Sequence, residues 1–467
     1  MQSDMVVTTS CSVMREYQRY SSDFIVNKRR VYLADEAGLG KTLSVLDAVV
    51  RLGAKRILVT APKCALYTWG AEGEKWFSLR SIVYTGTVAV RKRLLETFIN
   101  DCEITILVTT YAMLSEVMNI IKWDALIQDE VHRAGLFNRK SKTWAISAKA
   151  SRLVATYVAV TGTPIRRDLT DLWPILHIIN PIKFASFWNF VNDHCIVTTI
   201  GYDRQIEGRP KDVLKFKQLV STYMVRHKKK DVLTELPSKQ RNVVFCDLDP
   251  IQLRAYKSLI ETMVYEEDNS FIVTPTIIAM ITRLRELLVC PRVLDINSDG
   301  VAIELVGDML DDLFILERCA VIFTPYRRAV KHFRSYLMKR FKGIEVYEIH
   351  GQLSAQEISL AESRFQHSNN CRRVMICVIR SSTSFQLFKA SDCFFIGYEW
   401  SAIDNSQAED RLHRIGQQNN VICNYIVHNN TIDAEVALVL NRKQQAENWV
   451  LNSDQVLARI VDEKKQL

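Results

Sequence analysis

The sequence predicts an α/β protein made of two parallel sheets with helices on both faces, and a helical insertion between them. Short β-branched runs alternate with helical patterns in the first half, and the second half repeats this alternation. The 467 residues also exceed the size of one ordinary core. We therefore expect domains at 1–165 and 238–435, a helical insertion with a basic linker at 166–237, and a helical C-terminal extension at 436–467.

The first half contains five candidate strands: Val31–Ala34, Arg56–Thr60, Ile104–Thr109, Ala125–Gln128 and Tyr157–Val160. Each is followed by a polar or glycine-containing segment: Gly38–Thr42, Ala61–Lys63, Thr110–Tyr111, Asp129–His132 and Thr161–Pro164. The carboxyl ends of parallel strands share one edge of a sheet, which is where such folds bind ligands. We therefore expect one site to draw on all five segments.

The segment Asp35–Thr42 follows a short apolar run and opens the amphipathic stretch Leu43–Val50, giving strand, glycine-rich turn and helix. In such a turn the backbone N–H groups of Gly38, Leu39 and Gly40 can close around phosphate oxygens, aided by the helix N-terminus. Lys41 would reach the β- and γ-phosphates, and the Thr42 hydroxyl would bind Mg²⁺. The alternative is a chance match at an ordinary turn, but the flanking strand and helix favour the phosphate site.

The carboxylates of Asp129 and Glu130 end the apolar run Ala125–Ile127. Asp129 can hold Mg²⁺ through water, while Glu130 can act as general base on the water that attacks the γ-phosphate. An acidic pair that caps a strand or helix would be the simpler interpretation of these two residues alone. Their place at a strand end after a phosphate loop, and before His132, favours catalysis.

The region from Ile165 to about Leu236 is rich in aromatic residues and predicts helices and loops. It ends in the basic run Arg226–Lys230, whose composition alone favours a solvated helix face. Strand candidates in the second half are Ala320–Thr324, Ile344–Ile349, Arg373–Val378, Cys393–Ile396 and Val421–Ile426. Between these regions, Glu266–Thr276 is interpreted as a surface loop.

Near the end of the second half, Arg411 and Arg414 are spaced i, i+3, so on a helix they would share a face. Two guanidiniums on one face could stabilise transition-state charge on a triphosphate as arginine fingers. A surface helix with ion pairs to Glu409 and Asp410 explains the same residues equally well. If the arginines act on the phosphate loop, ATP would bind in a composite site that domain closure assembles.

Composition bounds the function classes. Lys+Arg 61 against Asp+Glu 52 gives a net charge of +9, which fits a polyanionic partner without proving one. The 11 cysteines show no C-x-x-C or zinc-site spacing, which is typical of reduced thiols in an intracellular protein. Met1–Arg15 has no apolar core of a secretion signal, and no apolar run reaches the ~20 residues of a membrane span.

Taken together, the motifs resemble those of the superfamily 2 nucleic-acid-dependent ATPases of the Swi/Snf-like branch, from Arg15 to about Glu435. Gln18 resembles the glutamine that reads adenine in this family, and Asp35–Thr42 resembles motif I. Asp129–His132 resembles the DEAH-type motif II, with Val131 in place of alanine, and Thr161–Pro164 resembles motif III. The resemblance implies two RecA-like domains that use ATP and Mg²⁺.

The similarity continues into the second half through Met224–Val232, Leu236–Lys239, Leu284–Arg285, Cys290–Pro291, His350–Gly351 and Gln407–Gln417. It implies that Gln407 contacts the nucleotide and that Arg411 and Arg414 are catalytic. Motif V departs from the family, because Ser381–Leu387 contains no glycine. This departure puts in doubt how tightly motif V binds the DNA backbone, or how it couples DNA binding to ATP hydrolysis.

The resemblance implies duplex or branched DNA as the partner, bound mostly through phosphates and therefore sensitive to salt. The candidate contacts are Pro62, Lys63, Thr110, Tyr111, His350, Gly351, Ser381, Ser382 and Thr383. The expected activity is an ATP-dependent DNA translocase that carries out branch migration, fork remodelling or strand annealing, as fork-remodelling members and phage branch-migration helicases do.

Three alternatives stay open: a strand-separating helicase, an ATPase that acts on RNA polymerase, and an idle DNA-binding scaffold. We expect a monomer without membrane contact, in a bacterial or phage-infected cytoplasm, with replication, recombination or transcription proteins as further partners.

Overall fold

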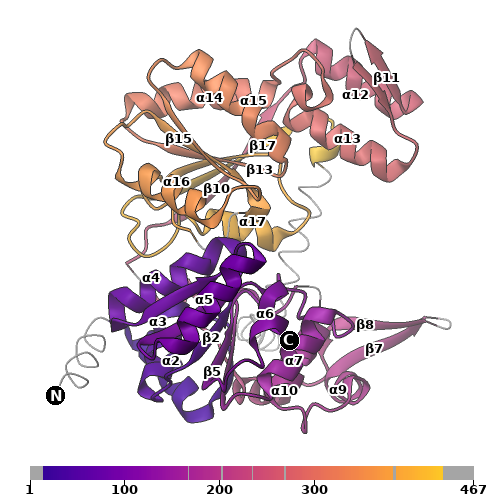
Figure 1. Ribbon diagram of the computed structural model, residues 1–467. Helices are drawn as coiled ribbons and strands as arrows, with labels where there is room; N and C mark the ends of the chain where they lie inside the picture. The colour runs from indigo at the N-terminus through magenta and orange to yellow at the C-terminus, as the bar shows by residue number, and fades with distance from the viewer. Residues whose placement is uncertain are drawn as a thin grey trace. The chain divides into compact units, whose positions relative to one another are not determined.

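The computed structural model describes residues 14–166, 168–200, 203–233, 235–267, 270–381 and 385–434 (Figure 1). These residues form two compact units, the first up to residue 233 and the second from Glu235. The expected C-terminal extension at 436–467 lies outside the described residues.

The first unit is built on a seven-stranded sheet in the order β3-β4-β2-β5-β6-β1-β9, in which all neighbours are parallel. Its strands are β1 Arg30–Leu33, β2 Ile57–Thr60, β3 Arg80–Tyr84, β4 Ile104–Thr109, β5 Ala125–Gln128, β6 Thr156–Val160 and β9 Met224–Val225. All five strands predicted for the first half are present and point in one direction. The sequence patterns did not predict β3 and β9.

Helices cover both faces of this sheet because successive strand residues point to opposite sides. On one face, Val31 and Leu33 of β1 pack in a core with α2 Glu16–Lys28, α3 Lys41–Arg51 and α4 Leu66–Phe77. On the other face, Tyr32 packs in a second core. The helices of that core are α5 Val88–Asn100, α6 Leu114–Val117, α7 Lys142–Ser151, α8 Trp173–Ile179, α9 Phe187–His194 and α10 Val213–Ser221.

The region predicted as a helical insertion is only partly helical. Between α9 and α10 it forms an antiparallel hairpin, β7 Cys195–Ile200 with β8 Asp203–Pro210, which projects from the first unit (Figure 1). It then returns to the first sheet as β9 and continues as the short helix α11 Lys229–Val232. The residues up to 233 therefore complete the first unit.

The second unit holds a six-stranded parallel sheet in the order β10-β17-β16-β13-β15-β14. Its strands are β10 Lys239–Cys246, β13 Ala320–Thr324, β14 Glu345–Ile349, β15 Arg373–Val378, β16 Asp392–Ile396 and β17 Val421–His428. The five predicted strands are confirmed, and β10 is an additional edge strand. The two parallel sheets confirm the predicted fold class.

Both faces of the second sheet carry helices. The core on one face includes α14 Val301–Ile315 and α15 Arg327–Arg340, and α16 Ala355–His367 and α17 Ala402–Glu409 lie on the other face (Figure 1). A separate small core joins α12 Pro250–Thr262 and α13 Ile277–Val289 to the hairpin β11 Val264–Glu267 and β12 Ser270–Val273. The interpretation of Glu266–Thr276 as a surface loop was therefore wrong, because this segment supplies β12 and buries Ile272 in that core.

Within the described ranges, the cysteines are free thiols, as expected. None of the helices that the structure describes has the length and apolar character needed to cross a membrane.

Candidate active site

The predicted phosphate loop connects β1 to α3, which confirms its strand-turn-helix context. Gly38 and Gly40 adopt φ angles of +87° and +71°, a region where glycine pays no steric penalty. Gly40 is the N-cap of α3, so the helix begins at Lys41 and its first N–H groups belong to the loop. This arrangement offers backbone donors and the positive end of a helix dipole to an anion.

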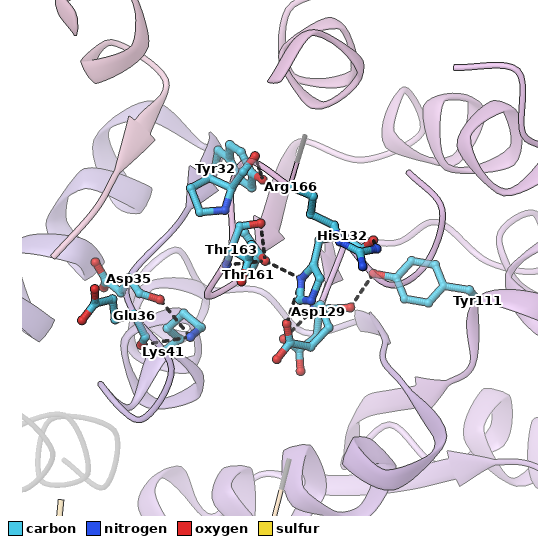
Figure 2. Close-up of polar contacts among 12 residues, drawn as sticks. Tyr32, Asp35, Glu36, Lys41, Tyr111, Asp129, His132, Thr161, Thr163 and Arg166 are labelled. Carbon is cyan, nitrogen blue, oxygen red and sulfur yellow. Dashed lines mark hydrogen bonds and ion pairs between the residues drawn. The ribbon is translucent and has the colours of Figure 1, made fainter. Parts of the chain in front are cut away.

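The Lys41 ammonium lies across the base of this loop (Figure 2). Its Nζ donates hydrogen bonds to the backbone carbonyl oxygens of Asp35, at 2.9 Å, and Glu36, at 3.2 Å. The side chain is thus held beside the loop by neutral acceptors, which an anionic phosphate can replace with a stronger, charge-assisted bond.

Helix α2 packs directly against the same loop. The Tyr17 hydroxyl and the Gln18 side-chain nitrogen each donate to the carbonyl oxygen of Leu39, both at 3.1 Å. A methyl group on Gly40 would collide with Gln18 Nε2. The structure therefore places Gln18, the predicted adenine-reading residue, in contact with the phosphate loop.

Asp129 follows β5 and is held by two donors. Trp69 Nε1 of α4 donates to its Oδ2 at 2.9 Å, and the Glu130 backbone N–H donates to its Oδ1 at 2.9 Å. Burial, followed by the negative charge of Glu130, raises the pKa of Asp129 to about 7, while Trp69 and the charge of Lys41 act in the opposite direction. A partly buried carboxylate in this setting is stabilised in its charged form by a nearby cation.

Glu130 adopts a left-handed backbone conformation with φ of +50°. For a residue other than glycine this costs about 1–3 kcal/mol, and such strain is concentrated at functional sites. His132 Nδ1 lies 3.2 Å from Glu130 Oε2 and 2.7 Å from the Thr161 hydroxyl oxygen. The carboxylate expected to act as general base is thus linked through His132 to the next strand end.

The turn after β6 contacts both the segment that carries these carboxylates and the phosphate loop, and Figure 2 shows the link from its Thr161 to His132. Thr163 N–H donates to Thr161 Oγ1 at 2.9 Å, which fixes the turn. At Gly162 a Cβ atom would lie 3.1 Å from the backbone nitrogen of Ala37, so the turn touches the loop and has little room for a side chain. The three segments assigned to motifs I, II and III therefore form one connected set at the predicted edge of the sheet.

Oxygen ligands for a magnesium ion are available in this set. Thr42 lies in the first turn of α3, and the positive charge of Lys41 acts to lower the pKa of Asp129. Hydroxyl and carboxylate oxygens are the ligands that Mg²⁺ prefers, so the predicted pair fits the ion.

The basic run Arg226–Lys230 contributes to this site, although its composition favoured a solvated helix face. The N–H and Nδ1 of His227 contact Asp35 Oδ1 at 2.7 and 2.8 Å. The Lys229 N–H donates to Glu36 Oε2 at 2.8 Å, and Lys229 is only 7% exposed. This contact was not predicted, and its one signal in the sequence is the acidic pair Asp35–Glu36 matched by a distant basic run.

In the second unit, α17 ends at Glu409, so the prediction that Arg411 and Arg414 share a helix face was wrong. Both lie in the turns that follow. Arg411 is 5% exposed, and it donates to the carbonyl oxygens of Gln407 at 3.2 Å and Phe385 at 3.3 Å. The predicted nucleotide residue Gln407 is itself buried on α17.

The alternative interpretation gave Glu409 ion pairs on a helix surface, but its buried carboxylate is instead bound by two cations of another strand. Its carboxylate accepts bonds from Arg241 at 2.6 and 2.7 Å and lies 2.9 Å from Lys239 Nζ. Both cations belong to β10, which the sequence patterns had not shown as a strand.

The candidate DNA-contact residues follow strand ends in each unit. Pro62 and Lys63 follow β2, and Thr110 precedes a short turn of helix after β4. The Tyr111 hydroxyl donates to the Asp129 carbonyl at 2.6 Å, which joins this segment to the carboxylates.

In the second unit, Gly351 lies close enough to Ser381 that a Cβ atom on the glycine would be 3.5 Å from the serine hydroxyl oxygen. The residue before it, His350, follows β14. Ser382 and Thr383 lie outside the described residues.

Comparison with known proteins matches residues 15–293 to the SNF2-related domain and residues 305–416 to the helicase conserved C-terminal domain. The chain is 26% identical to the CHD3-type chromatin-remodeling factor CHR7 of Arabidopsis thaliana, over 93% of this chain and 37% of that protein. It is 25% identical to an uncharacterized ATP-dependent helicase of Mycoplasma pneumoniae, over 94% of this chain and 42% of that one.

Among solved structures, the Sulfolobus solfataricus SWI2/SNF2 ATPase core in complex with dsDNA is 24% identical, with a TM-score of 0.43, covering 94% of this chain and 93% of that one. The chain spans well under half the length of the two curated relatives named above. Since the SNF2-related match alone covers more than half of its residues, this chain belongs to the SNF2-related family.

Proposed function

We propose that this chain hydrolyses ATP and uses the energy to move on duplex DNA. The observation that carries the proposal is the connected set in the first unit, where the phosphate loop, the carboxylates Asp129 and Glu130, and the Thr161 turn meet at one sheet edge. The family membership and the likeness to an ATP-dependent helicase support it.

In this proposal Lys41 exchanges its carbonyl partners for the β- and γ-phosphate oxygens, and the N–H groups at the start of α3 bind the same phosphates. Thr42 and Asp129 would hold a magnesium ion, which would neutralise charge on the phosphates when bound. Glu130 accepts the proton of the attacking water, and His132 keeps its carboxylate in place.

Arg411 and Arg414 supply positive charge for the transition state in this proposal. The Arg411 guanidinium already bonds two carbonyl groups of its own unit.

The strand-end loops bind DNA phosphates, so we expect affinity to fall steeply with salt and to depend little on sequence. Branch migration, fork remodelling or strand annealing inside a bacterial or phage-infected cell is the output that we propose for the motor. The sequence of Gln407–Gln417, which resembles that of fork-remodelling members, supports this choice.

The test is the steady-state ATPase rate without nucleic acid and with single-stranded DNA, duplex DNA, a four-way junction and RNA. Glu130→Gln should abolish hydrolysis, and Glu103→Gln, a change at an exposed ion pair with Arg80, is the matched control. Stimulation by duplex or junction DNA supports the proposal. Stimulation only by single strands or RNA would instead indicate a strand-separating helicase, and no stimulation at all would direct the search to protein partners such as RNA polymerase.

A further inference from the structure

His227 joins the phosphate loop to the chain segment that leads into the second unit. Its N–H and Nδ1 both contact Asp35 Oδ1, and its carbonyl oxygen accepts a bond from the Glu36 N–H at 3.0 Å. A carboxylate oxygen only accepts hydrogen bonds, so Nδ1 carries the proton in this contact. Two positions later, the Lys229 N–H donates to Glu36 Oε2.

Helix α2 holds the other side of the His227 ring. The centroid of the ring lies 5.7 Å from the ring centroid of Tyr17 and 5.6 Å from that of Tyr20, which it meets edge-on. Ser21 donates to Asp35 Oδ2 at 3.0 Å, so both oxygens of this buried carboxylate are bonded. Because Tyr17 also bonds Leu39 of the loop, helix α2, the phosphate loop and the segment after β9 all meet at His227.

The same two loop residues also hold Lys41, by their backbone carbonyls (Figure 2). Asp35 and Glu36 thus contact the phosphate-binding lysine through their main-chain carbonyls, and they contact the segment 227–229 through their carboxylates and the Glu36 N–H. A ligand that fixes the loop also fixes the carboxylates on which this segment is anchored.

We propose that His227 is a positioning residue that couples nucleotide bound at the phosphate loop to the chain segment leading into the second unit. The inference rests on the proposed function, from which it takes ATP as the ligand of the loop.

The coupling has a thermodynamic consequence that runs in both directions. A ligand that binds better when the segment is attached makes detachment rarer, and attachment raises the affinity for the ligand by the same factor. The backbone N–H groups of His227 and Lys229 report detachment directly, because each donates to a carboxylate of the loop. Their hydrogens exchange with solvent only when those bonds open.

The experiment is hydrogen–deuterium exchange of the full chain at these two amides, with and without magnesium and a non-hydrolysable ATP analogue, alongside calorimetric titration of the analogue. In the wild type, saturating analogue should slow exchange about fivefold or more, the lower range of typical couplings. In His227→Ala, the affinity for the analogue should fall by the same factor, and the analogue should no longer slow exchange at Lys229. In His227→Asn, whose amide nitrogen takes the place of Nδ1, both effects should return.

His367→Ala is the matched control, since the Nδ1 of this exposed histidine contacts the Ser363 carbonyl of its own helix. Bound analogue with unchanged exchange in the wild type would overturn the inference and leave the proposed function standing. A His227→Ala variant with faster exchange, a lower melting temperature and unchanged affinity would show a structural role only, and would also overturn it. Failure of the wild type to bind the analogue would overturn the proposed function and the inference together.

Discussion

Replacing Trp69 by phenylalanine tests whether the indole of α4 stabilises the charged Asp129. Trp69 is 1% exposed, and its Nε1 donates to Asp129 Oδ2 at 2.9 Å. Phenylalanine keeps an aromatic ring in the core but removes the donor, so the partly buried carboxylate of Asp129 loses one of its two bonds described above. The variant should therefore be less stable, for reasons of both packing and charge.

The expected magnitude follows from the acceptor. A hydrogen bond to a charged group contributes about 1.5–3 kcal/mol, against about 0.5–1.5 kcal/mol for a neutral pair. Trp123 offers a matched control in the same unit, because it is 2% exposed and its Nε1 donates to the neutral carbonyl of Val117 at 3.1 Å. Trp69→Phe should thus cost about 1–2 kcal/mol more than Trp123→Phe.

The assay is urea unfolding of both variants, followed by circular dichroism at pH 8.5, where Asp129 is ionised. The extra loss of stability in Trp69→Phe relative to Trp123→Phe should be smaller at pH 6. Burial and Glu130 raise the pKa of Asp129 to about 7, so at pH 6 the carboxyl is mostly protonated and accepts a weaker bond. Equal costs for the two variants at pH 8.5, or an extra loss that does not change with pH, would refute the reasoning.

Three further perturbations have clear expected outcomes. Gly40→Ala should raise the KM for ATP about tenfold in steady-state kinetics, because it adds about 1–2 kcal/mol of backbone strain at φ of +71° and displaces Gln18; an unchanged KM would contradict this. Burial lowers the pKa of His428, but its bond to Asp433 outweighs this effect and raises the pKa to about 9. The charged pair therefore contributes about 3 kcal/mol to the free energy of unfolding below pH 6.5, and this contribution should be lost as the pH rises through 9. His428→Gln should flatten this dependence in urea titrations at pH 6, 7.5 and 9, and a wild type without it would exclude the charged pair. Arg414→Ala should lower kcat about tenfold or more with little change in KM, whereas equal losses in both would indicate a ground-state contact.

The sequence patterns were informative where the structure is local. The run Ala125–Gln128 has the bounds of β5, and the glycines of the phosphate loop lie at the positive φ angles that the turn requires. Strand, turn and helix follow one another within a few residues, so composition and spacing are enough to show them. The resemblance then indicated which of these local elements belong together.

Contacts between distant residues were not predictable in this way. His227 and Asp35 are separated by 192 positions, and the basic run alone gave no reason to place one beside the other. Strand β9 has only two residues and no hydrophobic alternation of its own, so tertiary pairing with β1 determines it. Arg411 was assigned to a helix because i, i+3 spacing fits one, but the chain leaves the helix at Glu409, whose carboxylate is bound by β10.

The place of β10 in the second sheet also affects how this unit is made. β10 is the first strand of the unit to be synthesised, yet its partner is β17, and the Asn242–Asn424 contact between them spans 182 positions. Until β17 leaves the ribosome, β10 has no neighbour in its sheet and one edge of β16 is open. Such non-local pairing folds slowly and leaves unpaired strand edges that favour aggregation. A nascent chain that stalls before Val421 therefore lacks a complete second unit and is a natural substrate for chaperones and proteases.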